Sequence, residues 1–170
     1  HAVHSFLAHH LELNGFKEYP MEIAEVASMA MELFSMDHWE SFFDNAEDLK
    51  RAKAHQLERV ISIVPWIAII DRFQHWVYEN PTHTHAERTA SWVNILKEFQ
   101  DDVISYEGLE QYRGNAWQRQ LHLFEVPFYY IEYGIAQLGA IGMWMQYKQN
   151  PAQAINHYCN ALSLGDTRTL

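Results

Sequence analysis

The spacing of apolar residues is the feature that most constrains the fold of this chain. Apolar side chains recur at intervals of three and four residues along nearly all of its 170 residues, which is the period of an amphipathic helix. No convincing run alternates apolar and polar residues as a half-buried strand would. The sequence therefore predicts an all-α fold with few strands or none.

Proline, glycine and asparagine mark the expected ends of these helices. Pro20 suits a first helical turn, and Asn80-Pro81 ends a long helix that Pro65 is expected to kink, because proline removes a backbone donor. Asn14-Gly15 is expected to end the first helix as a C-cap. The predicted helices cover about 1–13, 20–35, 46–78, 85–104, 116–124, 127–149 and 151–164, with a short piece at 37–43 and a looser segment at 107–115. No Gly/Ser-rich linker separates them, so one helical domain over 1–170 is expected.

Composition and charge narrow the class of protein. Apolar residues make up 48% of the chain, which is enough to build a buried core. The formal net charge of −10 argues against nucleic acid and against an anionic membrane surface as partners, because both are bound largely through clustered Lys and Arg. The longest apolar runs are too short to span a bilayer. A single cysteine, Cys159, forms no intrachain disulfide, so we expect a cytoplasmic protein.

The first residues of the chain resemble part of a zinc-binding motif. Zinc peptidases place two histidines four residues apart on one helical face, and a glutamate beside the first histidine acts as general base. The stretch His1–Ala8, HAVHSFLA, is similar to the continuation of that motif, HExGHAxHS, in the oligoendopeptidase F family. The resemblance implies that His1 is the second zinc histidine and that the first histidine and the glutamate base lie upstream of it. His4 is implied as a residue behind the ligands or on the substrate side.

A second block matches the same family two dozen residues later. Glu25–Glu32, EVASMAME, fits the pattern Glu-x-x-Ser-x-x-x-Glu, and the resemblance implies that Glu25 is the third zinc ligand. Glu32 lies two helical turns further along the same face, where a carboxylate can accept the other ring N–H of a zinc histidine. Alternatively, both glutamates are solvated charges on an amphipathic helix. The apolar residues around them favour a buried helix instead.

The third block, residues 120–137, contains a histidine followed by an aromatic and proline stretch. The resemblance implies that His122 and the phenols of Tyr130 and Tyr133 donate hydrogen bonds to the substrate and to the tetrahedral oxyanion. Packing in the core or at a helix interface is the competing interpretation of Tyr130 and Tyr133, and Tyr129 could replace either. Phe124–Pro127 stands where thimet oligopeptidase has a glycine-rich loop, so the bacterial oligoendopeptidases are the nearer branch.

The three blocks together are similar in order and spacing to the oligoendopeptidase F and thimet oligopeptidase family of zinc metallopeptidases. The resemblance implies an all-α, multi-helix fragment of a zincin-type catalytic domain, truncated at both ends, whose complete enzyme uses one zinc ion. That enzyme would hydrolyse short peptides with a zinc-activated water. The fragment itself is expected to be inactive, because the first zinc histidine and the base would be missing.

Two other classes of function remain open at this stage. Residues 151–164 resemble one helix of a tetratricopeptide repeat, which would suit a helical interaction scaffold, although no second copy recurs near 34 residues. A helical-bundle metal carrier that uses His1, His4, Glu25 and Glu32 is the third possibility. Hydrolysis of peptides by a longer chain would distinguish the peptidase from both.

Overall fold

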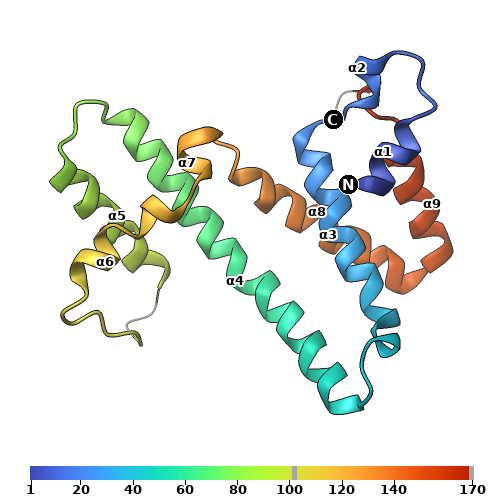
Figure 1. Ribbon diagram of the computed structural model, residues 1–170, viewed down its shortest axis with the longest axis horizontal. Coiled ribbons are helices and arrows are strands. Elements are labelled where there is room, and N and C mark those ends of the chain that lie inside the picture. The colour runs from blue at the N-terminus through green and yellow to red at the C-terminus, as the bar shows by residue number, and fades with distance from the viewer. Residues whose placement is uncertain (101–102, 169–170) are drawn as a thin grey trace. The chain divides into compact units, whose positions relative to one another are not determined.

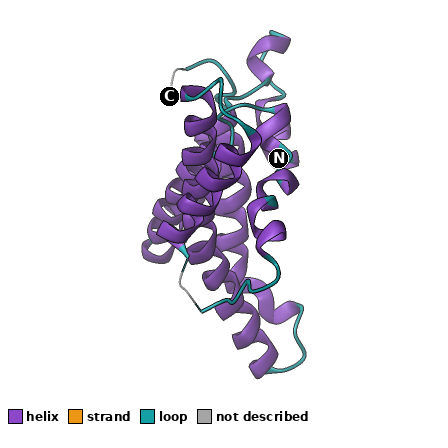
Figure 2. Ribbon diagram, turned by 90° about the vertical axis from the view of Figure 1, so that its left-hand side faces the viewer, coloured by secondary structure: helices purple, strands orange, loops and turns teal. Residues whose placement is uncertain are grey.

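The structure is a computed structural model that describes residues 1–100 and 103–168, with residues 21–22 described by their backbone alone. Its described residues contain helices and loops but no strand, which confirms the all-α prediction (Figures 1 and 2). The helical elements are α1 Ala2–Ala8, α2 Asn14–Lys17, α3 Met21–Ser35, η1 Met36–Ser41, α4 Ala46–Glu79, α5 His85–Phe99, α6 Glu110–Gly114, η2 Ala116–Arg119, α7 His122–Glu125, α8 Ile131–Gln149 and α9 Pro151–Leu162.

The chain divides into two compact units. The first, unit 1, comprises His1–Glu58 together with Glu132–Leu170, so it joins the first third of the sequence to its last part. The second, unit 2, is the continuous segment Arg59–Ile131. Helix α4 contributes residues to both units and continues as a helix through Pro65. The kink expected at Pro65 stays a prediction.

Aromatic and small side chains build the core of unit 1. Helix α3 buries Ala24, Ala27 and Phe34, which recur at helical spacing along one face. The ring of Phe34 stacks on Tyr147 at 4.8 Å and meets the edge of Tyr158 at 5.5 Å. Small residues on α3 therefore leave room for the large rings that α8 and α9 supply.

Unit 2 is built around a cluster of aromatic rings. Phe73 of α4 meets the edge of Trp92 of α5 at 5.0 Å and lies 5.6 Å from Trp117. The buried indole of Trp92 donates a hydrogen bond to the carbonyl of Arg113 at 3.0 Å, which fixes the backbone of α6 against α5. These contacts hold together the segment that leads to His122.

Several helix boundaries differ from those expected. Asn14-Gly15 does not cap the first helix, because α1 ends at Ala8 and these two residues begin the short helix α2. The helix expected over 116–124 is two pieces, since Gln120 between them is extended. Helix α8 begins at Ile131 rather than near Pro127, because Phe128 has a φ of 60°. Helix α5 ends at Phe99 because Gln100 is extended.

The length and apolar character of the helices decide whether one of them could cross a membrane. Among the described residues, no helix combines the length and the apolar character that crossing a bilayer requires.

Candidate functional site

Two of the predicted metal ligands come together in unit 1. His1 precedes α1, and Glu25 lies in the second turn of α3; their Nε2 and Oε2 atoms are 3.9 Å apart. The Glu25 side chain is only 15% exposed, whereas that of His1 is 54% exposed. Zinc binds nitrogen and oxygen ligands at about 2.0–2.2 Å, so two donors at this separation can both reach one ion. Imidazole and carboxylate are also the donor types that zinc takes in peptidases, and the pair therefore fits part of a zinc site.

His4 is a buried residue of unit 1. Its side chain is 1% exposed and its ring stacks on Tyr19 at 3.7 Å with an interplanar angle of 12°. Burial, with a smaller effect from the charged N-terminus, lowers the pKa of His4 below 6.5, so the ring is neutral at pH 7. Its Nδ1 atom has no hydrogen-bond partner among the described residues. His4 thus acts first as a core residue that packs α1 on Tyr19.

Glu32 occupies a more open position than Glu25. Its side chain is exposed, and its Oε2 atom accepts a hydrogen bond from the Gln56 amide at 3.0 Å. No hydrogen bond or ion pair between described residues links Glu32 to His1. A role for Glu32 behind the metal ligands stays a prediction.

The predicted catalytic residues of unit 2 are His122 and Tyr130. The His122 ring stacks near Tyr129 at 6.0 Å and meets Tyr130 edge-on at 5.1 Å. The amide nitrogen of Gln120 lies 2.7 Å from Nδ1 of His122 and donates to it. Because an amide nitrogen only donates, Nδ1 accepts in this contact, and a neutral ring then carries its proton on Nε2. The Tyr130 ring itself is 9% exposed.

A strained residue fixes the backbone just before these tyrosines. Phe128 adopts a φ of 60°, a conformation that a bulky L-residue rarely takes. Its backbone N–H donates to the side-chain oxygen of Gln74, a residue of α4 that is 3% exposed, at 3.0 Å. The Phe128 ring also lies 4.9 Å from His75 and 5.0 Å from Tyr78. These contacts with α4 therefore hold Phe128 in place, and Tyr129 and Tyr130 follow it directly in the sequence.

Tyr133 lies in the first turn of α8 and belongs to unit 1. The predicted site residues are thus divided between the two units: His1, His4, Glu25, Glu32 and Tyr133 lie in unit 1, and His122 and Tyr130 lie in unit 2. That His1, Glu25, His122, Tyr130 and Tyr133 surround one cavity stays a prediction. Among the side chains that the structure describes, no cluster of three or more His, Cys, Asp or Glu residues is suited to a metal.

Sequence reasoning missed three residues that support these groups. Tyr19 packs on His4, Gln120 orients His122, and Gln74 holds Phe128. Gln120 could have been found, since an amide two residues from a candidate catalytic histidine is a natural partner. Gln74 could not have been found, because in the sequence a single glutamine within a long helix looks like any exposed polar residue.

A known protein family matches nearly the whole chain. The profile of peptidase family M3 matches residues 1–169. No curated protein sequence matches the chain.

Three solved structures resemble the chain closely. A structure of PZ peptidase A with an inhibitor is 32% identical, with a TM-score of 0.87 over 98% of this chain and 29% of that protein. An oligoendopeptidase F is 35% identical, with a TM-score of 0.85 over 97% of this chain and 29% of that protein. An oligoendopeptidase F from Bacillus anthracis str. Ames is 26% identical, with a TM-score of 0.75 over 98% of this chain and 26% of that protein.

The fold and the matched sequence are those of a helical part of a peptidase family. The chain belongs to peptidase family M3, which confirms the family that the three sequence blocks predicted. It spans less than a third of the length of the solved relatives.

Proposed function

We propose that the chain is part of the catalytic domain of a zinc-dependent oligopeptidase, which hydrolyses short peptides in its complete form. The observation that carries this proposal is the approach of His1 and Glu25 to 3.9 Å in a chain that belongs to a peptidase family. The pair joins residues 24 positions apart, and the sequence resemblance assigns both to one metal. Neither the interaction scaffold nor the metal carrier accounts for membership of a peptidase family.

The chemistry of the site follows from the residues on each unit. When bound, zinc supplies a Lewis acid and an activated water for attack on the scissile carbonyl. The carboxylate of Glu25 and the imidazole of His1 would hold the ion. His122, with its proton on Nε2, and the phenol of Tyr130 are suited to donate hydrogen bonds to the substrate carbonyl as negative charge develops on its oxygen.

The 170-residue chain on its own is expected to be inactive. A catalytic zinc site normally has three protein ligands and an open position for water, and His1 and Glu25 provide two. A general base is also required to accept the proton of that water. We therefore assign the third zinc ligand, a histidine, and the glutamate base to residues outside these 170.

The test compares this chain with one extended at its N-terminus by a His-Glu-x-x segment that completes the motif at His1. Both are assayed with a quenched fluorescent peptide, with and without a chelator. We expect chelator-sensitive hydrolysis by the extended chain alone. In that chain, Glu25→Gln should lower kcat/KM by about 100-fold or more because a metal ligand is lost. Tyr130→Phe should lower kcat by roughly 100-fold with little change in KM.

Glu12→Gln serves as the matched control, since it removes the same charge from an exposed position in unit 1. Its activity should equal that of the unchanged extended chain. Full activity of Glu25→Gln, or chelator-sensitive turnover by the 170-residue chain, would show that the ligand assignment is wrong.

A further inference from the structure

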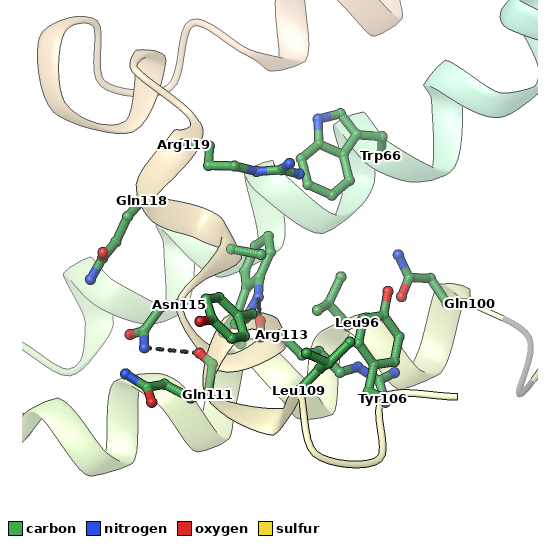
Figure 3. Close-up of a pocket in the computed structure, with 13 residues that line it drawn as sticks. Trp66, Leu96, Gln100, Tyr106, Leu109, Gln111, Arg113, Asn115, Gln118 and Arg119 are labelled. Atoms are coloured by element: carbon green, nitrogen blue, oxygen red, sulfur yellow. Dashed lines mark hydrogen bonds between the residues drawn. The ribbon is translucent and has the colours of Figure 1, made fainter. Parts of the chain in front are cut away.

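Unit 2 contains a cavity that none of the predicted catalytic residues lines. It has a volume of about 690 Å³ and lies between the middle of α4, the end of α5 and the segment 106–119 (Figure 3). Cavities of this size accommodate small organic ligands. In Figure 3, Arg119 and Trp66 lie on one side of the cavity, and Leu109 and Tyr106 lie on the other.

The charged residues that line this cavity are both arginines. Arg113 and Arg119 contribute guanidinium groups, whereas no carboxylate is among the lining residues that the structure describes. This is unusual in a chain with 22 acidic and 12 basic residues. Neither arginine has an ion-pair partner within the described part of the chain. The cavity therefore favours an anion.

Arg113 is held in place without using its hydrogen-bonding capacity. Its guanidinium lies over the ring of Tyr106, 4.5 Å from the ring centroid, and its carbonyl accepts the Trp92 indole N–H at 3.0 Å. The Nε atom of Arg113 is buried and has no hydrogen-bond partner among the described residues. A planar guanidinium that is positioned but unpaired matches a carboxylate, which accepts two parallel N–H bonds.

The rest of the lining is aromatic or amide in character. Trp66 meets Trp92 edge-on at 6.0 Å, so its ring packs against the core of unit 2. The Trp66 side chain also lines the cavity. Such rings bind flat apolar groups, and the side-chain amides of Gln100 and Gln118 can bond to a peptide group. The lining thus combines a receptor for a carboxylate with a surface for an aromatic ring.

We propose that this cavity binds a carboxylate that is attached to an aromatic group, as in the C-terminal residue of a peptide that ends in Phe, Tyr or Trp. The carboxylate pairs with Arg113 and Arg119, and the aromatic ring packs on Trp66. A free aromatic amino acid shares this chemistry but also carries an ammonium group, for which the described lining offers no carboxylate. The proposal does not depend on the peptidase assignment, because binding requires neither zinc nor turnover.

The test is a titration of the 170-residue chain by NMR with four small probes. N-acetylphenylalanine carries both features, N-acetylphenylalaninamide lacks the carboxylate, N-acetylalanine lacks the ring, and free phenylalanine adds the ammonium. We expect N-acetylphenylalanine to bind saturably with a Kd of about 1 mM, which is typical of a ligand this small. Each of the other three should bind at least about tenfold more weakly, because a charge-assisted bond or the ring contact is lost or the ammonium is unpaired.

Variants locate the binding site. Arg113→Gln and Arg119→Gln should each weaken the binding of N-acetylphenylalanine about tenfold or more. Arg119 is exposed, so its variant tests the proposal even if Arg113→Gln disturbs folding. Arg51→Gln is the matched control, since it removes the same charge from an exposed residue of unit 1 that pairs with Asp48. Equal binding of the acid and its amide, equal loss in Arg51→Gln, or no saturable binding would overturn the proposal.

Discussion

At the scale of single residues, the backbone of Phe128 shows how the segment before the tyrosines is held. A φ of 60° at a bulky residue costs on the order of 1–3 kcal/mol and persists only where surrounding contacts impose it. Here those contacts are the hydrogen bond to Gln74 and the rings of His75 and Tyr78. The direction of the following Tyr129 and Tyr130 therefore depends on a residue of α4, 54 positions earlier in the sequence.

Replacing Gln74 tests this dependence. Gln74→Met keeps the volume of the buried side chain but removes the acceptor of the Phe128 N–H, so we expect unit 2 to lose about 1 kcal/mol of stability. Hydrogen exchange at the Phe128 amide should accelerate at the same time, while amides of α5 change little. Gln74→Glu keeps an acceptor oxygen and should restore protection at Phe128. Unchanged exchange at Phe128 in Gln74→Met would contradict the role of this bond.

His4 gives a pH-dependent prediction at the same scale. Burial lowers the pKa of its imidazole in the folded chain below the unfolded value of about 6.5. The unfolded chain therefore binds a proton that the folded chain does not, and the free energy of unfolding contributed by His4 falls as the pH drops below about 6.5.

The variant His4→Phe keeps a ring against Tyr19 and removes this titration. Urea unfolding at pH 7.5 and pH 5.0 should show a larger loss of stability on acidification in the unchanged chain than in His4→Phe. Because the other histidines are present in both proteins, the difference isolates His4. Equal losses in the two proteins would mean that the His4 ring titrates normally when folded.

The chemistry of individual residues was predicted unevenly from the sequence. His1 and Glu25 were paired by resemblance alone, and the structure brings their donor atoms to 3.9 Å, although their role as ligands stays a prediction. Glu32 was predicted from its spacing of two helical turns; it bonds to Gln56 at an exposed position, and its role also stays a prediction. Helical spacing gives the face of a residue, whereas its partner depends on which helix packs there. That information is absent from a local pattern.

At the scale of secondary structure, the starts of helices were predicted where local chemistry decides them. Helix α5 begins at His85, as predicted, and Thr84 caps it: the Thr84 hydroxyl accepts from the Glu87 N–H at 3.3 Å, and the Glu87 carboxylate accepts from the Thr84 N–H at 2.7 Å. Helix α9 begins at Pro151 behind the cap of Asn150, also as predicted. The start of α8 could not be predicted, because tertiary contacts of Phe128 decide where the chain becomes helical again.

The capping box of α5 gives a test at this scale. Thr84→Ala removes the side-chain acceptor of the Glu87 N–H and should lower the stability of unit 2 by about 1 kcal/mol. Thr82→Ala is the matched control, since Thr82 is exposed in the same loop and lies outside the helix. Its stability should stay within about 0.5 kcal/mol of the unchanged chain. Similar losses in both variants would show that the loop, rather than the cap, carries the effect.

The cap also adjusts the pKa of Glu87. The hydrogen bonds from the Thr84 backbone and hydroxyl lower the pKa of the Glu87 carboxyl below 4.5. The stability that the ionised Glu87 carboxylate contributes is therefore fully present above the pKa of the unfolded chain. It is lost as the pH falls through the lower pKa of the folded chain. Acid titration followed by NMR should show this pKa moving upward in Thr84→Ala.

At the scale of the whole molecule, unit 1 depends on contacts between the two ends of the sequence. The phenol of Tyr158 in α9 donates to the carbonyl of Ala27 in α3 at 2.7 Å, across 131 positions. The N–H of Asp166 donates to the carbonyl of Phe16 at 3.0 Å, next to Gly165, where a Cβ atom would lie 2.0 Å from that carbonyl oxygen. The sequence predicted the helices on both sides but not their pairing, because period alone does not say which helices meet.

Tyr158→Phe provides the test of that closure. The variant leaves the Ala27 carbonyl without its buried donor and keeps the ring, so we expect unit 1 to lose about 1–2 kcal/mol. Hydrogen exchange should accelerate in α3 and α9, which the bond joins, while the core of unit 2 around Trp92 keeps its protection. Faster exchange throughout unit 2 would contradict two separately stabilised units.

The same phenol makes a prediction for alkaline conditions. Burial raises the pKa of Tyr158 to about 12, with a smaller contribution from Cys159, whereas the unfolded phenol titrates near 10. As the pH rises from about 10 toward 12, the unfolded chain loses a proton that the folded chain retains, so the unfolding free energy falls. Urea unfolding at pH 8 and pH 11 should show this fall in the unchanged chain and a smaller one in Tyr158→Phe. The other tyrosines are common to both proteins, so equal falls would show that Tyr158 ionises in the folded chain as readily as it does in water.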